Sequence, residues 1–292
     1  MQIIDKCFSK KVNYIDDDIK KYFPMAYDDY QYMKKVVYYE KNNDKSACFT
    51  LPLSEIIISE GMGVDLSVNK KDNTLKSNEY VYDDIEILAS NINFNIETKK
   101  IKNTMQLCKY FSEKNEEYIF NIPGVMSILN SMIDITKVFK AIRKNKELIE
   151  IIFSKVRKYI IEYSQMAFDN GVRVISYSDP ILREGIMSKK ESNWVMENFT
   201  YKLLSDFKKI MPNDAIIHIC PQNLKLMELA KLISIKDFTL EENYYNKLVF
   251  NLREKEQFVG GMCINSRIYT KEIKKIELVK REIGLCLEKK KL

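Results

Sequence analysis

The fold is decided by one stretch of the chain, Ala215-Ile216-Ile217-His218-Ile219-Cys220-Pro221-Gln222. A run of apolar β-forming residues that ends in proline predicts a buried strand whose last residues leave the sheet. His218 is the single histidine of the chain, and Cys220 lies two positions later, so both point to the same face of such a strand. An imidazole and a thiol side by side can share a metal ion, and zinc favours this pair of ligands.

A lone His-x-Cys pair also has a simpler interpretation, a hydrogen-bonded core histidine beside a buried free cysteine, which is the commoner case. The metal interpretation gains from a second apolar strand candidate over residues 258–265, which carries Cys263 near its end. The chain has six widely spaced cysteines, a pattern that predicts free thiols or metal ligands rather than a disulfide scaffold. Both interpretations of the pair remain open on this evidence from the residues alone.

Length and composition predict one soluble domain. No Pro/Gly/Ser-rich linker divides the 292 residues, so we expect a single domain over 1–292, with residues 1–45 as an N-terminal helical cap and 46–292 as the main body. The net charge of +6 is spread along the chain, which disfavours a nucleic-acid partner. The start lacks the apolar core of a signal peptide and no later run approaches a membrane span, so we expect a cytoplasmic protein without a membrane partner.

Strands and helices alternate along most of the sequence. Predicted strands begin near residues 48, 117, 172, 215 and 258, and an apolar stripe predicts a long helix over 146–170. This alternation predicts an α/β fold with parallel strands, and the lack of a Gly-x-Gly-x-x-Gly or Walker loop favours a (β/α)8 barrel of the TIM type. The polar residues expected at or just after strand ends, where barrels assemble their sites, are Glu60, Asn121, Asp179, His218 and Cys263.

Other predictions concern the acidic residues of the first strand loop and the last third of the chain. Glu55 is expected on the solvated surface, and Glu60, flanked by glycines, is expected to line the mouth of the site. A Thr-Leu-Glu-Glu capping box at 239–242 predicts a helix that runs to about residue 255. A closing helix is expected from about residue 270 to 290, with Cys286 as a bystander within it.

Several segments together resemble the uroporphyrinogen decarboxylase superfamily, and within it the zinc-dependent methyltransferases typified by methylcobamide:coenzyme M methyltransferase. They are the run 51–63, the Asn-Ile-Pro-Gly turn at 121–124, the long helix leading to Ser-Asp-Pro at 178–180, and His-Ile-Cys at 218–220. The resemblance covers roughly residues 46–285 and implies a (β/α)8 barrel, with residues 273–276 in its closing helix. It also implies a zinc ion held by His218, Cys220 and Cys263.

The sequence departs from the family pattern in three places. Pro221 stands where the family usually has glycine, and Pro123-Gly124 inverts the usual order of the two residues. The interval from Cys220 to Cys263 is short for a complete βα unit and the next strand, so we expect one reduced unit in the barrel.

The resemblance implies a zinc-dependent transfer of a methyl group from a methylated corrinoid, as co-substrate, to a small thiol. The corrinoid would arrive free or on a partner corrinoid protein, with Asn121 contacting it and with Glu60 and Asp179 positioning the substrate. One alternative is a lyase like uroporphyrinogen decarboxylase, but a carboxylate-rich porphyrinogen needs guanidinium partners, and the chain has no arginine before Arg143. The other alternative is a non-catalytic barrel that binds a corrinoid protein.

Overall fold

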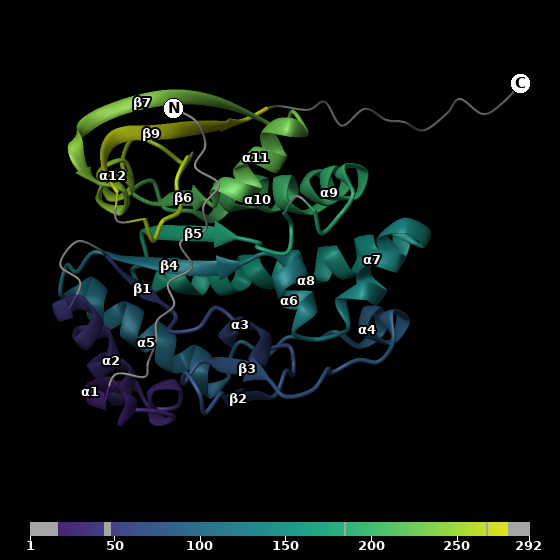
Figure 1. The fold of residues 1–292 in the computed structure, drawn as a ribbon, viewed down its shortest axis with the longest axis horizontal. Coiled ribbons are helices and arrows are strands. Elements are labelled where there is room, and N and C mark those ends of the chain that lie inside the picture. Colours follow the sequence, from purple (N-terminus) through teal and green to yellow (C-terminus); the bar gives the residue numbers. More distant parts are fainter. Residues whose placement is uncertain (1–16, 44–47, 184, 267, 280–292) are drawn as a thin grey trace, which may run out of the picture.

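The computed structural model describes residues 17–43, 48–183, 185–266 and 268–279. Its centre is a seven-stranded sheet with the strand order β1-β4-β5-β6-β8-β9-β7 (Figure 1). The strands are β1 (Phe49–Leu51), β4 (Tyr118–Pro123), β5 (Val174–Ser178), β6 (Ile216–Ile219), β8 (Phe258–Gly260), β9 (Tyr269–Leu278) and β7 (Ile233–Tyr244). The first five are parallel, and β9 and β7 extend the sheet in antiparallel pairs. The predicted α/β class, with parallel strands joined by helical crossovers, is confirmed.

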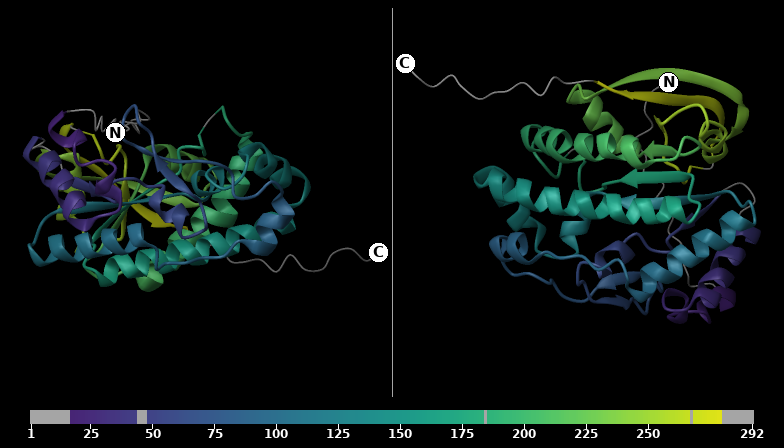
Figure 2. Two further views of the ribbon diagram at one scale, coloured as in Figure 1. Left: turned by 90° about the horizontal axis from the view of Figure 1, so that it is seen from below. Right: turned by 180° about the vertical axis from the view of Figure 1, so that it is seen from behind.

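One face of the sheet, called here the outer face, is covered by α5 (Lys99–Glu113), α8 (Lys146–Asp169) and α10 (Tyr201–Ile210), which lie in front of the strands in the right panel of Figure 2. Alternate residues of each strand project toward these helices, since side chains alternate with period two. Phe120, Ile175 and Ile217 are examples, and all three are buried in the main hydrophobic core. The predicted long helix is therefore α8, and Gly171, at φ +89°, follows its last turn.

The opposite, inner face of the sheet is apolar near the beginnings of the strands. Ile119, Val174 and Ile216 form a second core there with α12 (Tyr245–Asn251), which contributes Tyr245 and Leu248. Toward the carboxyl ends the inner-face positions become polar, as the strand registers below show. The inner face thus places its polar side chains where a parallel barrel assembles its site.

The reduced βα unit predicted from the short interval lies between β6 and β8. These two strands pair directly, with His218 opposite Val259, although β7 comes between them in the sequence. β7 instead pairs with β9 at the far end of the sheet. Among the described residues β1 and β7, at the two ends of the strand order, do not pair with each other.

Two helix predictions in the last third are wrong. The capping box at 239–242 lies inside β7, and the following helix, α12, covers only Tyr245–Asn251. Residues 269–278 form β9 instead of the start of a closing helix, because Ile273 is buried against α12 and Ile276 in the main core, one on each face of the strand. Pairing with two neighbouring strands overrides the helical spacing of these residues. The remainder of that predicted helix, with Cys286, lies outside the described residues.

The other elements surround this frame. The N-terminal helices are α1 (Asp17–Lys20), the 3-10 helix η1 (Met25–Tyr27) and α2 (Tyr30–Asn43), followed by α3 (Ile57–Glu60), the hairpin β2 (Leu66–Val68) and β3 (Leu75–Ser77), and α4 (Ile85–Asn91). After β4 come α6 (Val125–Asn130) and α7 (Ile135–Lys144), and after β5 come α9 (Lys189–Val195), the π-helix η2 (Met196–Thr200) and α10. α11 (Pro221–Leu229) follows β6. No helix in the described part of the chain has the length and apolar composition needed to cross a membrane.

Candidate active site

A row of polar side chains crosses the inner face through three neighbouring strands. Asn121 of β4 pairs with Ser176 of β5, and Ser176 pairs with His218 of β6. Register partners in parallel strands project to the same face, so these three residues, called here the polar row, line up beside one another. Asn121 is partly exposed, whereas Ser176 and His218 are buried at 4% and 1% exposure. The solvent exposure of the polar row therefore decreases from Asn121 on β4 to His218 on β6.

The imidazole of His218 has a protein partner at each nitrogen. Nε2 lies 2.9 Å from the carbonyl oxygen of Met262, and Nδ1 lies 3.0 Å from the Ser176 hydroxyl. A carbonyl can only accept, so Nε2 carries the proton and the Ser176 hydroxyl donates to Nδ1. Burial lowers the pKa of His218 to about 4, and the ring is therefore neutral at neutral pH. As it stands, His218 matches the simpler interpretation of a hydrogen-bonded core histidine.

The two predicted cysteine ligands follow the neighbouring strands β6 and β8. Cys220 is the partly exposed residue just before α11, and Cys263 is buried shortly after β8. Tyr245 packs edge-on against His218 with 5.8 Å between ring centroids. Burial raises the pKa of the Tyr245 hydroxyl far above its ordinary value, a hydrogen bond with the backbone of Met262 acts in the opposite direction, and Cys263 and Cys220 contribute to the rise. Tyr245 thus packs against His218, and Cys263 and Cys220 lie close enough to influence its ionisation.

The three side chains fit zinc in chemical type, since one imidazole and two thiols are ligands that zinc prefers. Their arrangement does not yet form a closed ligand set. Within the described ranges, no three His, Cys, Asp or Glu side chains are close enough to hold one metal ion. The carbonyl of Met262 occupies Nε2 of His218, so a metal ion there would first have to displace it.

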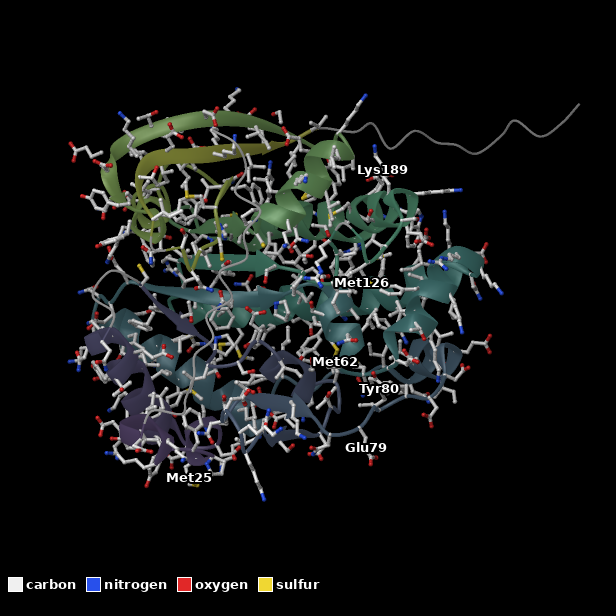
Figure 3. The ribbon with its side chains drawn as sticks, viewed as in Figure 1. Met25, Met62, Glu79, Tyr80, Met126 and Lys189 are labelled. Carbon is white, nitrogen blue, oxygen red and sulfur yellow. The ribbon has the colours of Figure 1, made fainter. Side chains whose placement is uncertain are left out.

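Asp179, predicted as a catalytic residue, joins three elements at the carboxyl ends of the strands. Its carboxylate accepts hydrogen bonds from the Met126 N–H at 2.8 Å and from the Ser127 N–H and hydroxyl at 3.2 and 2.8 Å, so it caps α6. Its backbone N–H donates to the Asn223 side chain in α11 at 2.7 Å. Met126 is labelled in Figure 3, beside α6 near the middle of the molecule. Burial raises the pKa of Asp179 to about 6, against the lowering effect of these hydrogen bonds.

Glu60 lies elsewhere than predicted. It is the last residue of α3 rather than a residue at a strand end, and its Oε1 is 2.9 Å from Nζ of Lys100 in α5. Lys100 also pairs with Asp28 at 2.9 Å. The second oxygen, Oε2, is buried and has no hydrogen-bond partner in the described structure. The structure therefore brings Glu60 to α5 and the N-terminal helices rather than to the polar row.

Glu55 is the acidic residue that the sequence analysis missed. It lies in the turn after β1, is partly exposed, and makes no hydrogen bond or ion pair in the part of the chain that the structure describes. Burial raises the pKa of Glu55 to about 7, and the nearby charge of Asp179 contributes to the rise. A carboxyl group with this pKa can donate or accept a proton near neutral pH. The sequence analysis predicts a solvated Glu55, and the position of Glu55 four residues after a strand is the signal in the sequence for a functional role.

Comparisons with known proteins identify the family and a similar fold. The profile of the uroporphyrinogen decarboxylase (URO-D) family matches residues 14–265. Among solved structures, a methyltransferase from Methanosarcina mazei has a similar fold, with a TM-score of 0.61, 17% sequence identity and coverage of 74% of this chain. The match spans 64% of that protein, which is less than two thirds of its length. A comparison with curated sequences finds no match.

Proposed function

The chain belongs to the uroporphyrinogen decarboxylase family, and from this premise we propose that it is an enzyme whose site lies on the inner face at the carboxyl ends of β1, β4, β5 and β6. We propose methyl transfer from a methylated corrinoid to a small thiol as its reaction. The observation that supports this proposal is that one imidazole and two thiols, from His218, Cys220 and Cys263, lie on or just after the two neighbouring strands β6 and β8. The fold shared with a methyltransferase agrees with the proposal without deciding the substrate.

The charge of the site favours this reaction over decarboxylation of a porphyrinogen. The inner-face positions of the described parallel strands carry no arginine or lysine. A substrate with many carboxylates would require such groups, since guanidinium is the bidentate partner of a carboxylate. A neutral polar row with the carboxyls of Glu55 and Asp179 nearby suits a small thiol better.

The proposed metal is zinc, with Nε2 of His218 and the sulfur atoms of Cys220 and Cys263 as its ligands. When bound there, zinc would lower the pKa of a substrate thiol and keep the resulting thiolate nucleophilic. Ser176 would then accept the hydrogen bond of the Nδ1–H and hold the orientation of the imidazole ring. We propose Glu55, whose pKa is raised to about 7, as the group that takes the proton of the incoming thiol, and Asn121 as the polar side chain that contacts the corrinoid.

Metal analysis of the purified protein tests the proposal. We expect about one zinc ion per chain, retained in a Cys108→Ser control, because Cys108 is buried in α5 on the outer face. Cys220→Ser and Cys263→Ser should each lose the metal. The metal-loaded protein should then demethylate methylcobalamin in the presence of coenzyme M or homocysteine, as followed by the visible spectrum of the corrinoid. A metal-loaded preparation inactive with every thiol would refute the proposed reaction.

A metal-free lyase is the second candidate, and one observation favours it. Both nitrogens of His218 already have protein partners, while Glu55 and Asp179 have raised pKa values. A carboxyl that is protonated near neutral pH can supply the proton that replaces a departing carboxylate. Turnover of a carboxylated substrate by protein treated with chelator would support the lyase. Absence of turnover with both substrate classes would favour the non-catalytic alternative, a binding partner of a corrinoid protein.

A further inference from the structure

A cavity of about 270 Å³ lies beside α8, and the proposed reaction makes no use of it. Met62 after α3, Ile92 after α4 and Val156 of α8 line this cavity, and all three side chains are buried; Met62 is labelled in Figure 3. The ring of Tyr159 also lines it, and the Tyr159 hydroxyl already donates to the carbonyl oxygen of Ile58 at 2.5 Å. The buried part of the lining therefore offers mainly apolar contacts.

The exposed part of the lining carries two lysines of α8. Nζ of Lys155 donates to the carbonyl oxygens of Ala89 and Ser90 at 2.7 and 3.3 Å, and Lys155 forms no ion pair within the described part of the chain. Lys158 is 80% exposed, and its Nζ lies 3.7 Å from Oε1 of Glu162. An exposed pair at this distance contributes little to stability, so Lys158 can turn to another anion at small cost. The cavity thus joins a buried apolar part to an entrance with two cations.

The volume and the charges of the cavity limit the chemistry of a ligand. An apolar cavity of about 150 Å³ holds benzene, so 270 Å³ accommodates roughly ten non-hydrogen atoms. Burial of an aliphatic chain raises affinity roughly fourfold per methylene group. Glu162 at the same entrance repels a doubly charged group, such as a phosphate monoester, more strongly than a singly charged carboxylate. A short aliphatic chain that ends in a carboxylate satisfies all of these conditions.

We propose that this cavity binds a medium-chain aliphatic carboxylate. Its chain lies against Met62, Ile92 and Val156, and its carboxylate pairs with Lys155 and Lys158. The site is distinct from the proposed active site, because none of its lining residues belongs to the polar row or to the proposed zinc ligands. Binding of the carboxylate therefore does not depend on the metal or on the reaction.

Isothermal titration calorimetry with octanoate tests the proposal. We expect one octanoate per chain, with an affinity that rises roughly fourfold for each methylene group from butanoate to octanoate and levels off for longer chains, which exceed the cavity. 1-Octanol has the same chain without the charge and should bind several-fold more weakly. Absence of octanoate binding, or an affinity that does not depend on chain length, would overturn the proposal.

The charged entrance is tested by variants at exposed positions. Lys158→Gln should weaken octanoate binding roughly two- to fivefold and leave 1-octanol binding unchanged. Glu162→Gln should strengthen octanoate binding, because it removes the competing carboxylate. Lys202→Gln is the matched control, since it removes an exposed lysine of α10 that does not line the cavity. An equal loss of octanoate binding in the Lys158 and Lys202 variants would overturn the proposal, because it would show a general effect of net charge.

Discussion

Gly124 occupies a place where the site leaves no room for a side chain. A Cβ atom added there would lie 2.3 Å from Cβ, 2.4 Å from Oδ2 and 2.5 Å from Cγ of Asp179. The backbone of Gly124 has φ −79° and ψ 173°, which any residue can adopt. Gly124→Ala therefore adds no backbone strain and acts only by forcing Asp179 away from the start of α6.

The expected loss of stability in Gly124→Ala follows from the contacts of Asp179. Displacement of its carboxylate breaks the cap of α6, which accepts hydrogen bonds from the Met126 and Ser127 N–H groups and the Ser127 hydroxyl. Loss of such a cap costs about 0.5–2 kcal/mol. Forcing a methyl group into a close-packed site costs about 1–3 kcal/mol more. We therefore expect Gly124→Ala to lower the free energy of unfolding by about 1.5–5 kcal/mol.

Urea denaturation followed by circular dichroism measures this loss, and Gly63→Ala is the contrasting variant. Gly63 has φ +88° and no atom within 4 Å of an added Cβ, so its substitution should cost only the strain of about 1–2 kcal/mol. A cycle with Asp179→Gly, which removes the Cβ as well as the carboxylate, gives the decisive comparison. If the clash with Asp179 is the cause, Gly124→Ala should cost much less in the Asp179→Gly background. Equal costs in both backgrounds would refute the reasoning.

Two further predictions concern acidic groups. The pKa of Glu55 is raised from 4.5 to about 7, so its contribution to stability is complete below pH 4.5 and is lost as the pH rises through 7. We expect the urea concentration at the unfolding midpoint to decrease as the pH rises from 5 to 8, and we expect a smaller decrease in Glu55→Gln. A pH profile that is unchanged in the variant would contradict the assignment of this pKa to Glu55. Glu60→Gln should lower the free energy of unfolding by about 1–2 kcal/mol through loss of the pair with Lys100. Glu60→Gln should leave turnover unchanged, and a loss of turnover at normal stability would show that Glu60 acts in the active site.

The strand at 216–219 and the helix at 146–169 were predictable because each carries a strong local pattern of apolar residues. Asn121 and His218 of the polar row were predicted at strand ends, because those strands could be located, whereas Ser176 was not singled out. Glu55 was missed because a single glutamate has no pattern, and its proximity to Asp179 depends on the pairing of β1 with β4. The partner of His218 Nε2 was beyond prediction, because it is a backbone carbonyl and every residue has one. β9 was mistaken for a helix because its two isoleucines are buried by elements distant in sequence.

The bond between His218 and Met262 affects the affinity of the site for any ligand. A group that approaches Nε2 has to compete with a carbonyl that is already in place at 2.9 Å. A hydrogen bond of this kind contributes about 1 kcal/mol, so the apparent affinity at Nε2 is lower than the intrinsic affinity by roughly fivefold. The same bond keeps the imidazole satisfied when no ligand is present. When a ligand binds to Nε2 or leaves it, one partner of this nitrogen replaces another. The imidazole ring therefore has a partner at Nε2 in both states.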